Sequence, residues 1–240
     1  MVHMADARVL TPAADTGRSI ASLLLRNGCY TTNPHLESTP HFTWGRLLGP
    51  ARATCSCRVL NGFPLAARTV AEELASSARA WIGEVDLVIG MESAGVPWAT
   101  RVATLFSAPL VSVSAEGKSG RINLGRFPLR KGFRTILIDD SVVFGDTAVR
   151  ALDLLYKEEG ITVDAVLSIT NWKTRRMSEA FGSRGVTIGA LVDSNSLLSA
   201  AVIEKLIDAH QRRELKEFYV GLDDRYTGGV VDPVPGGDED

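Results

Sequence analysis

From residue 64 to residue 218, short continuous apolar runs alternate with longer segments whose apolar positions recur every three or four residues. The short runs predict buried strands, and the longer segments predict helices. We place the strands at 86–91, 109–113, 134–139, 163–170 and 186–192, and the helices at 65–82, 95–106, 147–158, 175–181 and 199–218. Such an alternation is typical of an α/β fold, a mainly parallel sheet flanked by helices.

The segments on either side of this core have other patterns. Residues 15–27 have helical spacing, whereas 29–57 are irregular and broken by prolines, which predicts short antiparallel strands in a small hood. The two chain ends lack periodicity, and the second is rich in glycine, proline and acids. The predicted organisation is a disordered N-terminus at 1–14, an N-terminal helix and hood at 15–60, a core at 61–218 and a flexible acidic tail at 219–240.

Composition and charge are those of an ordinary globular protein. The 240 residues are 45% hydrophobic and 22% charged, with a formal net charge of -2. That charge disfavours nucleic-acid binding through bulk electrostatics, and no apolar run approaches the ~20 residues of a membrane helix. The cysteines are Cys29, Cys55 and Cys57, an odd number without an export signal ahead of them. We therefore expect reduced thiols and a cytoplasmic location.

The stretch 134–147 carries the clearest candidate chemistry. An apolar run leads into Asp139 and Asp140, and after a short turn with Gly145 a helix opens at Thr147. In open α/β sheets ligands bind at the carboxyl ends of strands, and a helix N-terminus offers unpaired N–H groups to a phosphate. Two carboxylates beside such groups suit a ligand with hydroxyls at one end and a phosphate at the other. The alternative is that the two acids simply end a strand.

The segment 136–147 resembles the phosphoribosyl-diphosphate (PRPP) motif of type I phosphoribosyltransferases, in which an apolar strand ends in two acids before a glycine-containing phosphate loop. Upstream, 89–97 resembles the pyrophosphate loop of the same family. The order of elements is similar to that of the orotate branch, with its hood and a glycine-rich loop, here 114–131. The resemblance implies Mg²⁺-dependent transfer of 5-phosphoribose from PRPP to a nucleobase or related acceptor, with release of pyrophosphate, by a homodimer.

The resemblance also implies roles for individual residues. Asp139 and Asp140 would accept hydrogen bonds from the ribose hydroxyls and bind Mg²⁺ indirectly through PRPP and water, and Lys118 would close on the pyrophosphate; these three are the expected catalytic residues. The other expected PRPP-binding residues are Glu92, Ser93, Ala94 and Gly95 at the pyrophosphate and Val143, Phe144, Gly145, Asp146 and Thr147 at the 5′-phosphate. The expected acceptor-binding residues are Glu37, His41, Phe42, Trp172 and Lys173.

The PRPP site departs from the family pattern at three places. The loop at 114–131 is poor in cations beside that of orotate enzymes, with Lys118 and, as a substitute second charge, Arg121. Ala94 stands where a lysine usually precedes the glycine of the pyrophosphate loop. Asp146 places a carboxylate in the phosphate loop, where it would repel a phosphate. We expect its side chain to point outward, where it complements the helix dipole.

The acceptor site departs further. Trp172 stands where orotate enzymes have an arginine for the base carboxylate, and Glu37 lies in a hood segment that usually carries lysines. Loss of a bidentate cation partner, typically worth ~1.5–3 kcal/mol, favours an acceptor other than orotate, such as one of specialised biosynthesis. Lys173 offers a substitute cation, which keeps orotate and pyrimidine biosynthesis open. Trp172 either stacks on a flat acceptor ring or packs at its strand end.

Two functions from different classes remain open at this point. The favoured one is a PRPP-dependent phosphoribosyltransferase. The other is a PRPP- or nucleotide-sensing regulatory protein that keeps the binding fold without the chemistry, which the cation-poor loop and Ala94 favour.

Overall fold

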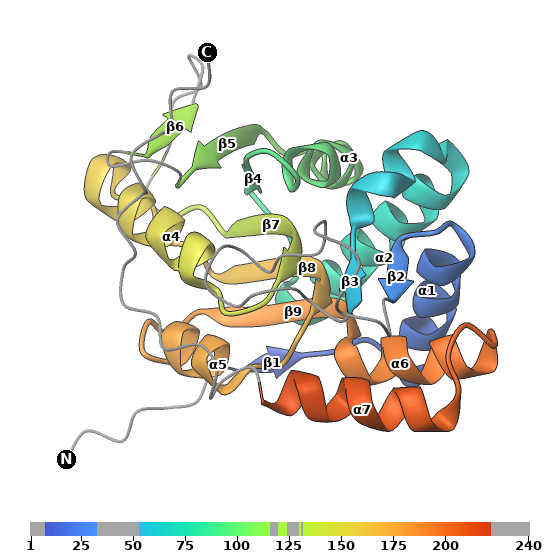
Figure 1. The fold of residues 1–240 in the computed structure, drawn as a ribbon. Helices are drawn as coiled ribbons and strands as arrows, with labels where there is room; N and C mark the ends of the chain where they lie inside the picture. The colour runs from blue at the N-terminus through green and yellow to red at the C-terminus, as the bar shows by residue number, and fades with distance from the viewer. Residues whose placement is uncertain (1–7, 33–52, 116–119, 124–129, 131, 222–240) are drawn as a thin grey trace, which may run out of the picture.

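The computed structural model describes residues 8–32, 53–115, 120–123, 130 and 132–221. These residues form a seven-stranded sheet with helices on both sides and a separate two-stranded sheet (Figure 1). In spatial order, the strands of the large sheet are β1 (Val9–Leu10), β9 (Thr187–Asp193), β8 (Ala165–Asn171), β7 (Thr135–Val142), β4 (Leu87–Met91), β5 (Leu110–Ser114) and β6 (Arg121–Asn123). Neighbouring strands are parallel except β5 and β6. The predicted α/β fold class is confirmed.

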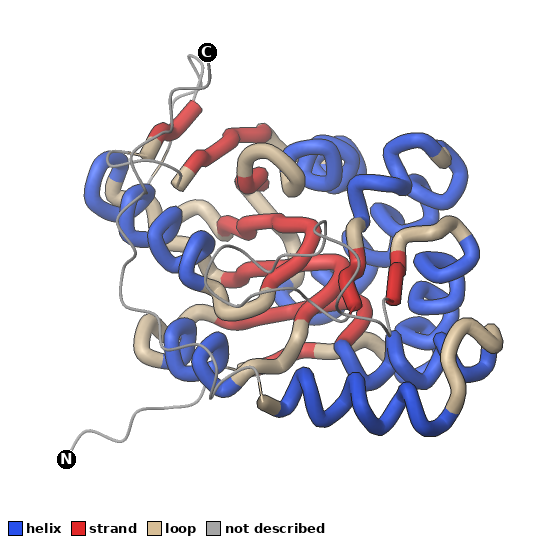
Figure 2. Tube along the Cα trace, in the orientation of Figure 1, coloured by secondary structure: helices blue, strands red, loops and turns tan. Residues whose placement is uncertain are grey.

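The large sheet separates two hydrophobic cores, and Figure 2 shows helices on both sides of the strands. One core lies beneath α4 (Asp146–Glu159) and α5 (Arg175–Gly182). The other lies beneath α1 (Ala14–Arg26), α2 (Pro64–Ile82), α3 (Val96–Phe106), α6 (Ser194–Ile203) and α7 (Ala209–Val220). Within β7, Leu137 belongs to the first core and Ile138 to the second. A strand buried on both faces needs apolar residues at successive positions, which explains the continuous runs in the sequence.

The prediction of one long helix at 199–218 is wrong, because the structure has α6 and α7 there. The chain leaves the helical conformation at Lys205, whose φ of 59° is left-handed. Asp208 then starts α7 with a capping box, in which it and Gln211 bond reciprocally to backbone N–H groups. Apolar residues such as Leu206 continue through the break, so periodicity concealed it.

The predicted boundary of a disordered N-terminus also needs correction. Val9 and Leu10 pair in parallel with β9, and α1 begins at Ala14, so ordered structure starts before residue 15. A two-residue strand is too short to produce a pattern in the sequence. The predicted start of the flexible tail at residue 219 needs correction too, because α7 continues to Val220 with Tyr219 buried. Residues 1–7 and 222–240 lie outside the described residues.

The segment predicted as a hood is described in part. Its strands β2 (Tyr30–Thr32) and β3 (Ala53–Cys55) pair antiparallel, as expected, and the 3₁₀ helix η1 (Cys57–Gly62) follows them. Residues 33–52 lie outside the described residues, and with them three of the predicted acceptor residues, Glu37, His41 and Phe42.

The start of α3 lies against β7 at Ile138 and Asp139 with no space between them. Gly95, the N-cap of α3, sits where a Cβ would be 2.3 Å from the carbonyl oxygen of Ile138 and 3.0 Å from the Cα of Asp139. A side chain at this position would push the two elements apart. The absence of a side chain at Gly95 therefore sets how closely the loop after β4 can approach the acids on β7.

Replacing Gly95 by alanine should lower the free energy of unfolding by roughly 1–3 kcal/mol, because backbone atoms must shift to admit the methyl group. Gly62 is a matched control, since a Cβ there would meet nothing within 4 Å and its φ is not left-handed. Urea unfolding measures the change in the free energy of unfolding of Gly95→Ala and of Gly62→Ala relative to the wild type. Equal stability of the two variants would contradict the close packing.

Candidate active site

Strand β7 brings the acid pair to the edge of the sheet where the loops gather. The strand continues to Val142, so Asp139 and Asp140 lie within it, which corrects the predicted strand end at residue 139. Parallel pairing with β8 holds the extension as far as Val142 and Asn171. Because successive residues of a strand point to opposite faces, Asp139 lies on the side of α4 and Asp140 on the side of η1.

The two carboxyl groups share a partly buried position. Asp139 Oδ1 accepts the backbone N–H of Asp140 at 2.8 Å. Burial, followed by the charge of Asp140, raises the pKa of Asp139, and burial also raises the pKa of Asp140. The guanidinium of Arg58 on η1 favours the charged forms but does not outweigh burial. The pair is therefore stabilised by any ligand that brings hydroxyl donors or positive charge.

The chain after β7 encloses a hollow of about 190 Å³, lined by Asp139 and residues 141–148. Gly145, with a left-handed φ of 81°, turns the chain there, and α4 starts at Asp146, one residue before the predicted start at Thr147. Since the N-cap residue is a glycine, no side chain caps the first N–H groups of α4. Such a hollow at the first turn of an uncapped helix is suited to a phosphate.

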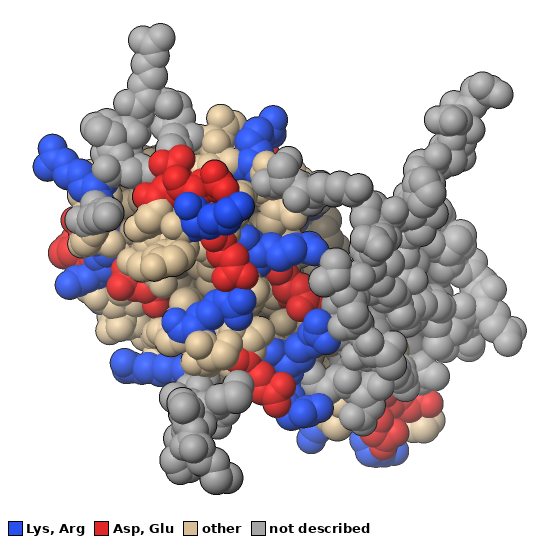
Figure 3. All heavy atoms as spheres, turned by 90° about the vertical axis from the view of Figure 1, so that its left-hand side faces the viewer, with Lys and Arg blue, Asp and Glu red and all other residues tan. Residues whose placement is uncertain are grey.

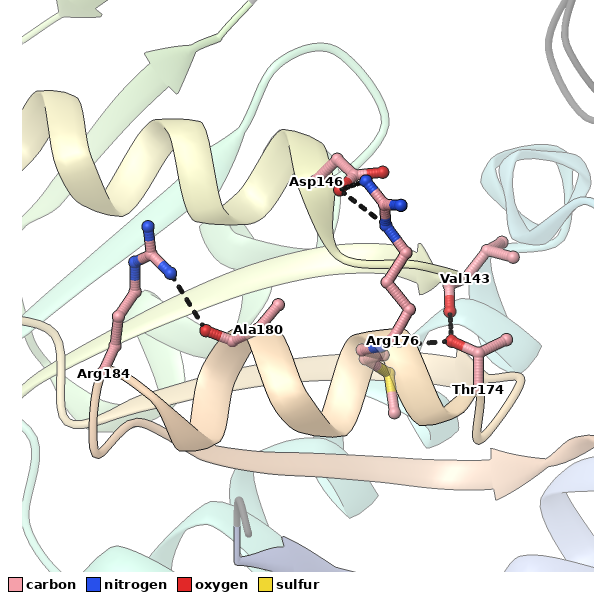
Figure 4. Close-up of polar contacts among 7 residues, drawn as sticks. Val143, Asp146, Thr174, Arg176, Ala180 and Arg184 are labelled. Carbon is pink, nitrogen blue, oxygen red and sulfur yellow. Dashed lines mark hydrogen bonds and ion pairs between the residues drawn. The ribbon is translucent and has the colours of Figure 1, made fainter. Parts of the chain in front are cut away.

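Helix α5 supports the phosphate loop, which we define as residues 143–147. Thr174 Oγ1 donates to the carbonyl oxygen of Val143 at 2.6 Å and accepts a backbone N–H from the first turn of α5 (Figure 4). One side chain thus caps α5 and ties it to the loop. Phe181 packs so closely against Gly145 that a Cβ on the glycine would lie 2.5 Å from its ring. The loop conformation therefore depends on α5 as well as on its own sequence.

A third contact between α5 and the loop is ionic. Arg176 reaches across from α5, and its Nε and Nη2 groups both donate to Oδ1 of Asp146, at 3.3 and 3.2 Å (Figure 4). We expected the Asp146 carboxylate to point outward from the loop. In the structure it pairs with Arg176, a contact that the sequence did not indicate. The acid in the phosphate loop is thus charge-paired.

The loop after β4 holds the residues expected at the pyrophosphate. Ser112 Oγ donates to Glu92 Oε1 at 2.7 Å, and Arg121 Nη2 lies 3.0 Å from Glu92 Oε2. These two bonds hold the pKa of Glu92 below its usual range. The Glu92–Ser93 peptide bond is cis. Arg121, our substitute second charge, therefore pairs with Glu92 in this structure, and Lys118 lies outside the described residues.

At the end of β8, both residues expected at the acceptor are engaged by the protein. Trp172 is 4% exposed, its indole N–H donates to Ser141 Oγ at 3.1 Å, and its ring centroid lies 4.7 Å from that of Tyr219. Lys173 Nζ lies 2.5 Å from Asp193 Oδ2. Burial opposes ionisation of Asp193, but Lys173 and the N–H of Ser196 outweigh it and lower the pKa. The packing interpretation of Trp172 thus has direct support.

Three further features sought in the sequence are a basic surface patch, a metal-binding group and a membrane-spanning helix. On the face shown in Figure 3, Lys and Arg side chains are interspersed with Asp and Glu side chains. Within the described ranges, no group of three or more His, Cys, Asp or Glu side chains is arranged to hold a metal ion. None of the helices in the described part of the chain has the length and apolar character needed to cross a bilayer.

Comparison with known proteins identifies first the class and then the branch. No protein-family model matches the sequence. The solved UMP synthase of Leishmania donovani matches with a TM-score of 0.68 and 24% identity, over 85% of this chain and 42% of that one. Orotate phosphoribosyltransferase of Aeropyrum pernix matches with a TM-score of 0.59 and 20% identity, over 78% and 98%. The fold is therefore that of the phosphoribosyltransferases.

The sequence comparison narrows this class. Orotate phosphoribosyltransferase of Listeria monocytogenes (serotype 4b) is 27% identical over 184 residues, which are 76% of this chain and 87% of the relative. The predicted resemblance to the orotate branch is confirmed: the chain is a homologue of orotate phosphoribosyltransferases.

Sequence reasoning predicted a PRPP site from the acid pair and the segments 92–95 and 143–147, and the structure brings all three segments to one edge of the sheet. It missed Ser141, Thr174, Arg176 and Tyr219. Thr174 had a signal, because a threonine before a helical segment is a preferred N-cap. Arg176 and Tyr219 had none, since their partners are distant in the chain.

The raised pKa of Asp139 makes the stability of the folded protein depend on pH. At a pH above the unfolded-state value of about 4, the folded protein still holds a proton that the unfolded chain has lost, so stability falls as pH rises toward the folded-state pKa. Asp139→Asn removes the contribution of Asp139 to this dependence and leaves that of Asp140. Between about pH 5 and about pH 9, the melting temperature of the variant should fall less than that of the wild type, as followed by thermal unfolding. Parallel pH profiles would contradict the assignment.

Proposed function

We propose that the protein transfers 5-phosphoribose from PRPP to a ring nitrogen of a nucleobase-like acceptor and releases pyrophosphate. The observation that carries the proposal is the meeting of Asp139, the hollow at the phosphate loop and the start of α3 at one edge of the sheet. In this arrangement the 5′-phosphate occupies the hollow, the ribose hydroxyls bond to the acid pair and the pyrophosphate lies at residues 92–95. Similarity to orotate phosphoribosyltransferases supports the same reaction class.

The chemistry requires the bond between the anomeric carbon and the pyrophosphate oxygen to break as the acceptor nitrogen bonds to that carbon. The ribose passes through an oxocarbenium-like state, as in glycoside cleavage. The residues of this chain contribute by positioning the two reactants and by fixing the phosphate end of the sugar. Asp139 and Asp140 orient the ribose through its hydroxyls, and their negative charge favours the positive charge that develops on the ring.

A magnesium ion fits the donor set at the acid pair. Carboxylate oxygens are the ligands that Mg²⁺ prefers, and burial of the Asp139 and Asp140 carboxyl groups, which raises their pKa values, favours added positive charge there. We assign these two residues to it, acting through PRPP and water. The ion, when bound, supplies charge neutralisation for the departing pyrophosphate.

Two acceptors have specific support. The name shared by the sequence relatives favours orotate. The contacts at the end of β8 favour a ring without a carboxylate, because Trp172 carries no charge and Lys173 is paired with Asp193.

The free thiols of Cys29, Cys55 and Cys57 agree with a cytoplasmic enzyme. By similarity to the orotate branch, we also propose a homodimer.

Incubation with PRPP, Mg²⁺ and a panel of bases that includes orotate, uracil and adenine tests the reaction through pyrophosphate release. Turnover with orotate identifies the acceptor of the relatives, and turnover with an uncharged base alone supports the second assignment. Tight PRPP binding without turnover on any base would favour the regulatory protein over the enzyme.

Asp139→Asn combined with Asp140→Asn should abolish PRPP binding and turnover, because both acceptors of the ribose hydroxyls lose their charge. Asp153→Asn is the control, since Asp153 lies on α4 and pairs with Arg184 outside the hollow. Calorimetric titration with PRPP measures both variants. Unchanged binding by the double variant would show that the ribose site lies elsewhere.

A further inference from the structure

The phosphate loop contains an acid that should oppose its proposed ligand. Asp146 is the first residue of α4 and lines the hollow assigned to the 5′-phosphate. A phosphate monoester carries a charge of about −1.5 to −2 near neutral pH, so an isolated carboxylate at this position would repel it. Either the hollow does not bind phosphate, or something on the protein offsets the charge of Asp146.

Arg176 is placed to offset that charge. Two of its N–H groups converge on Oδ1 of Asp146 at 3.2 and 3.3 Å. The two side chains are 37% and 35% exposed, so water screens the pair only in part. The contact draws the carboxylate toward α5 (Figure 4).

The position of Arg176 is set by the same helix that shapes the loop. Thr174, two residues earlier, bonds to the carbonyl oxygen of Val143, and Phe181, further along α5, packs against Gly145. Arg176 therefore starts from a backbone that is fixed to the phosphate loop on both sides of it. A long side chain that projects from a fixed backbone loses less conformational entropy when it binds one partner.

We propose that Arg176 is a positioning residue of the 5′-phosphate site: it holds the Asp146 carboxylate toward α5 and neutralises it, so that the loop accepts a phosphate. The inference rests on the proposed function, because it takes the hollow as the site of the 5′-phosphate of PRPP. Phosphate affinity then depends on Arg176 only while residue 146 is an acid. A purely structural ion pair would instead make Asp146→Asn lose phosphate affinity as Arg176→Ala does, because either change breaks the pair.

The chain offers a matched control for the pair. Arg184 and Asp153 also join the segment of α5 to α4, with Nη2 3.0 Å from Oδ2 and Nε 3.1 Å from Oδ1. Neither residue lines the hollow. Arg184→Ala therefore removes an arginine–aspartate pair between the same elements without changing the charge at the phosphate loop.

The test is calorimetric binding of PRPP, ribose 5-phosphate and pyrophosphate by wild type, Arg176→Ala, Asp146→Asn, the double variant and Arg184→Ala. Arg176→Ala should weaken PRPP and ribose 5-phosphate by roughly threefold to tenfold and leave pyrophosphate unchanged. The loss should shrink in high salt. Asp146→Asn should bind at least as well as wild type, the double variant should match Asp146→Asn, and Arg184→Ala should match wild type.

The outcomes distinguish failure of the proposed function from failure of the proposed role of Arg176. If wild type binds neither PRPP nor ribose 5-phosphate, the proposed function fails and the inference fails with it. If wild type binds both and Arg176→Ala binds them equally well, the inference alone is wrong. An equal loss from Arg176→Ala in the wild-type and Asp146→Asn backgrounds would also overturn it, because Arg176 would then act directly or through the fold. Should Arg176→Ala fail to fold, Arg176→Gln in both backgrounds gives the same comparison.

Discussion

The parallel pairing of β7 between β4 and β8 is the constraint on which the site depends. Parallel neighbours end at the same edge of a sheet, so the loops that follow the three strands must meet there. Gly95 lets the start of α3 lie directly on the end of β7, which brings the pyrophosphate loop to the acid pair. Disturbing this packing would therefore separate the two loops even where the acids on β7 are unchanged.

Two acidic side chains at the site are paired with arginines. Each proposed anion subsite contains an acid that an arginine already engages, Glu92 with Arg121 and Asp146 with Arg176. Among the described residues, Arg58 favours the charged forms of the acid pair on β7, but burial dominates there. Under the proposed function, anions would be held mainly by backbone N–H groups with local charges offset, whereas the acid pair would depend on its ligand for compensation.

The fold was largely predictable because two-sided burial leaves a strong pattern. The strands at 86–91, 163–170 and 186–192 each match an observed strand to within two residues. Failures occurred where a local backbone event interrupts a continuing pattern, as at Lys205, or where an element is as short as β1. At the site, the loop at 143–147 and the two acids could be recognised in the sequence because their residues are contiguous in the chain.

The supporting contacts were not visible, because they join residues far apart in sequence. Arg176 meets Asp146 only when α5 lies beside α4, and a charged residue on an exposed helix face has no distinguishing pattern.

Trp172 shows the same difficulty at the acceptor side. Its type and position suggested a stacking surface, yet Tyr219 at the end of α7 covers it and Ser141 accepts its N–H. Ser141 directly follows Asp140 in β7, so this indole links the end of β8 to the strand that carries the acid pair. Thr170 bonds to the same Ser141 hydroxyl at 2.9 Å, which reinforces the link. Trp172 thus takes a structural role beside the acids, so the proposed acceptor would be selected by groups other than this side chain.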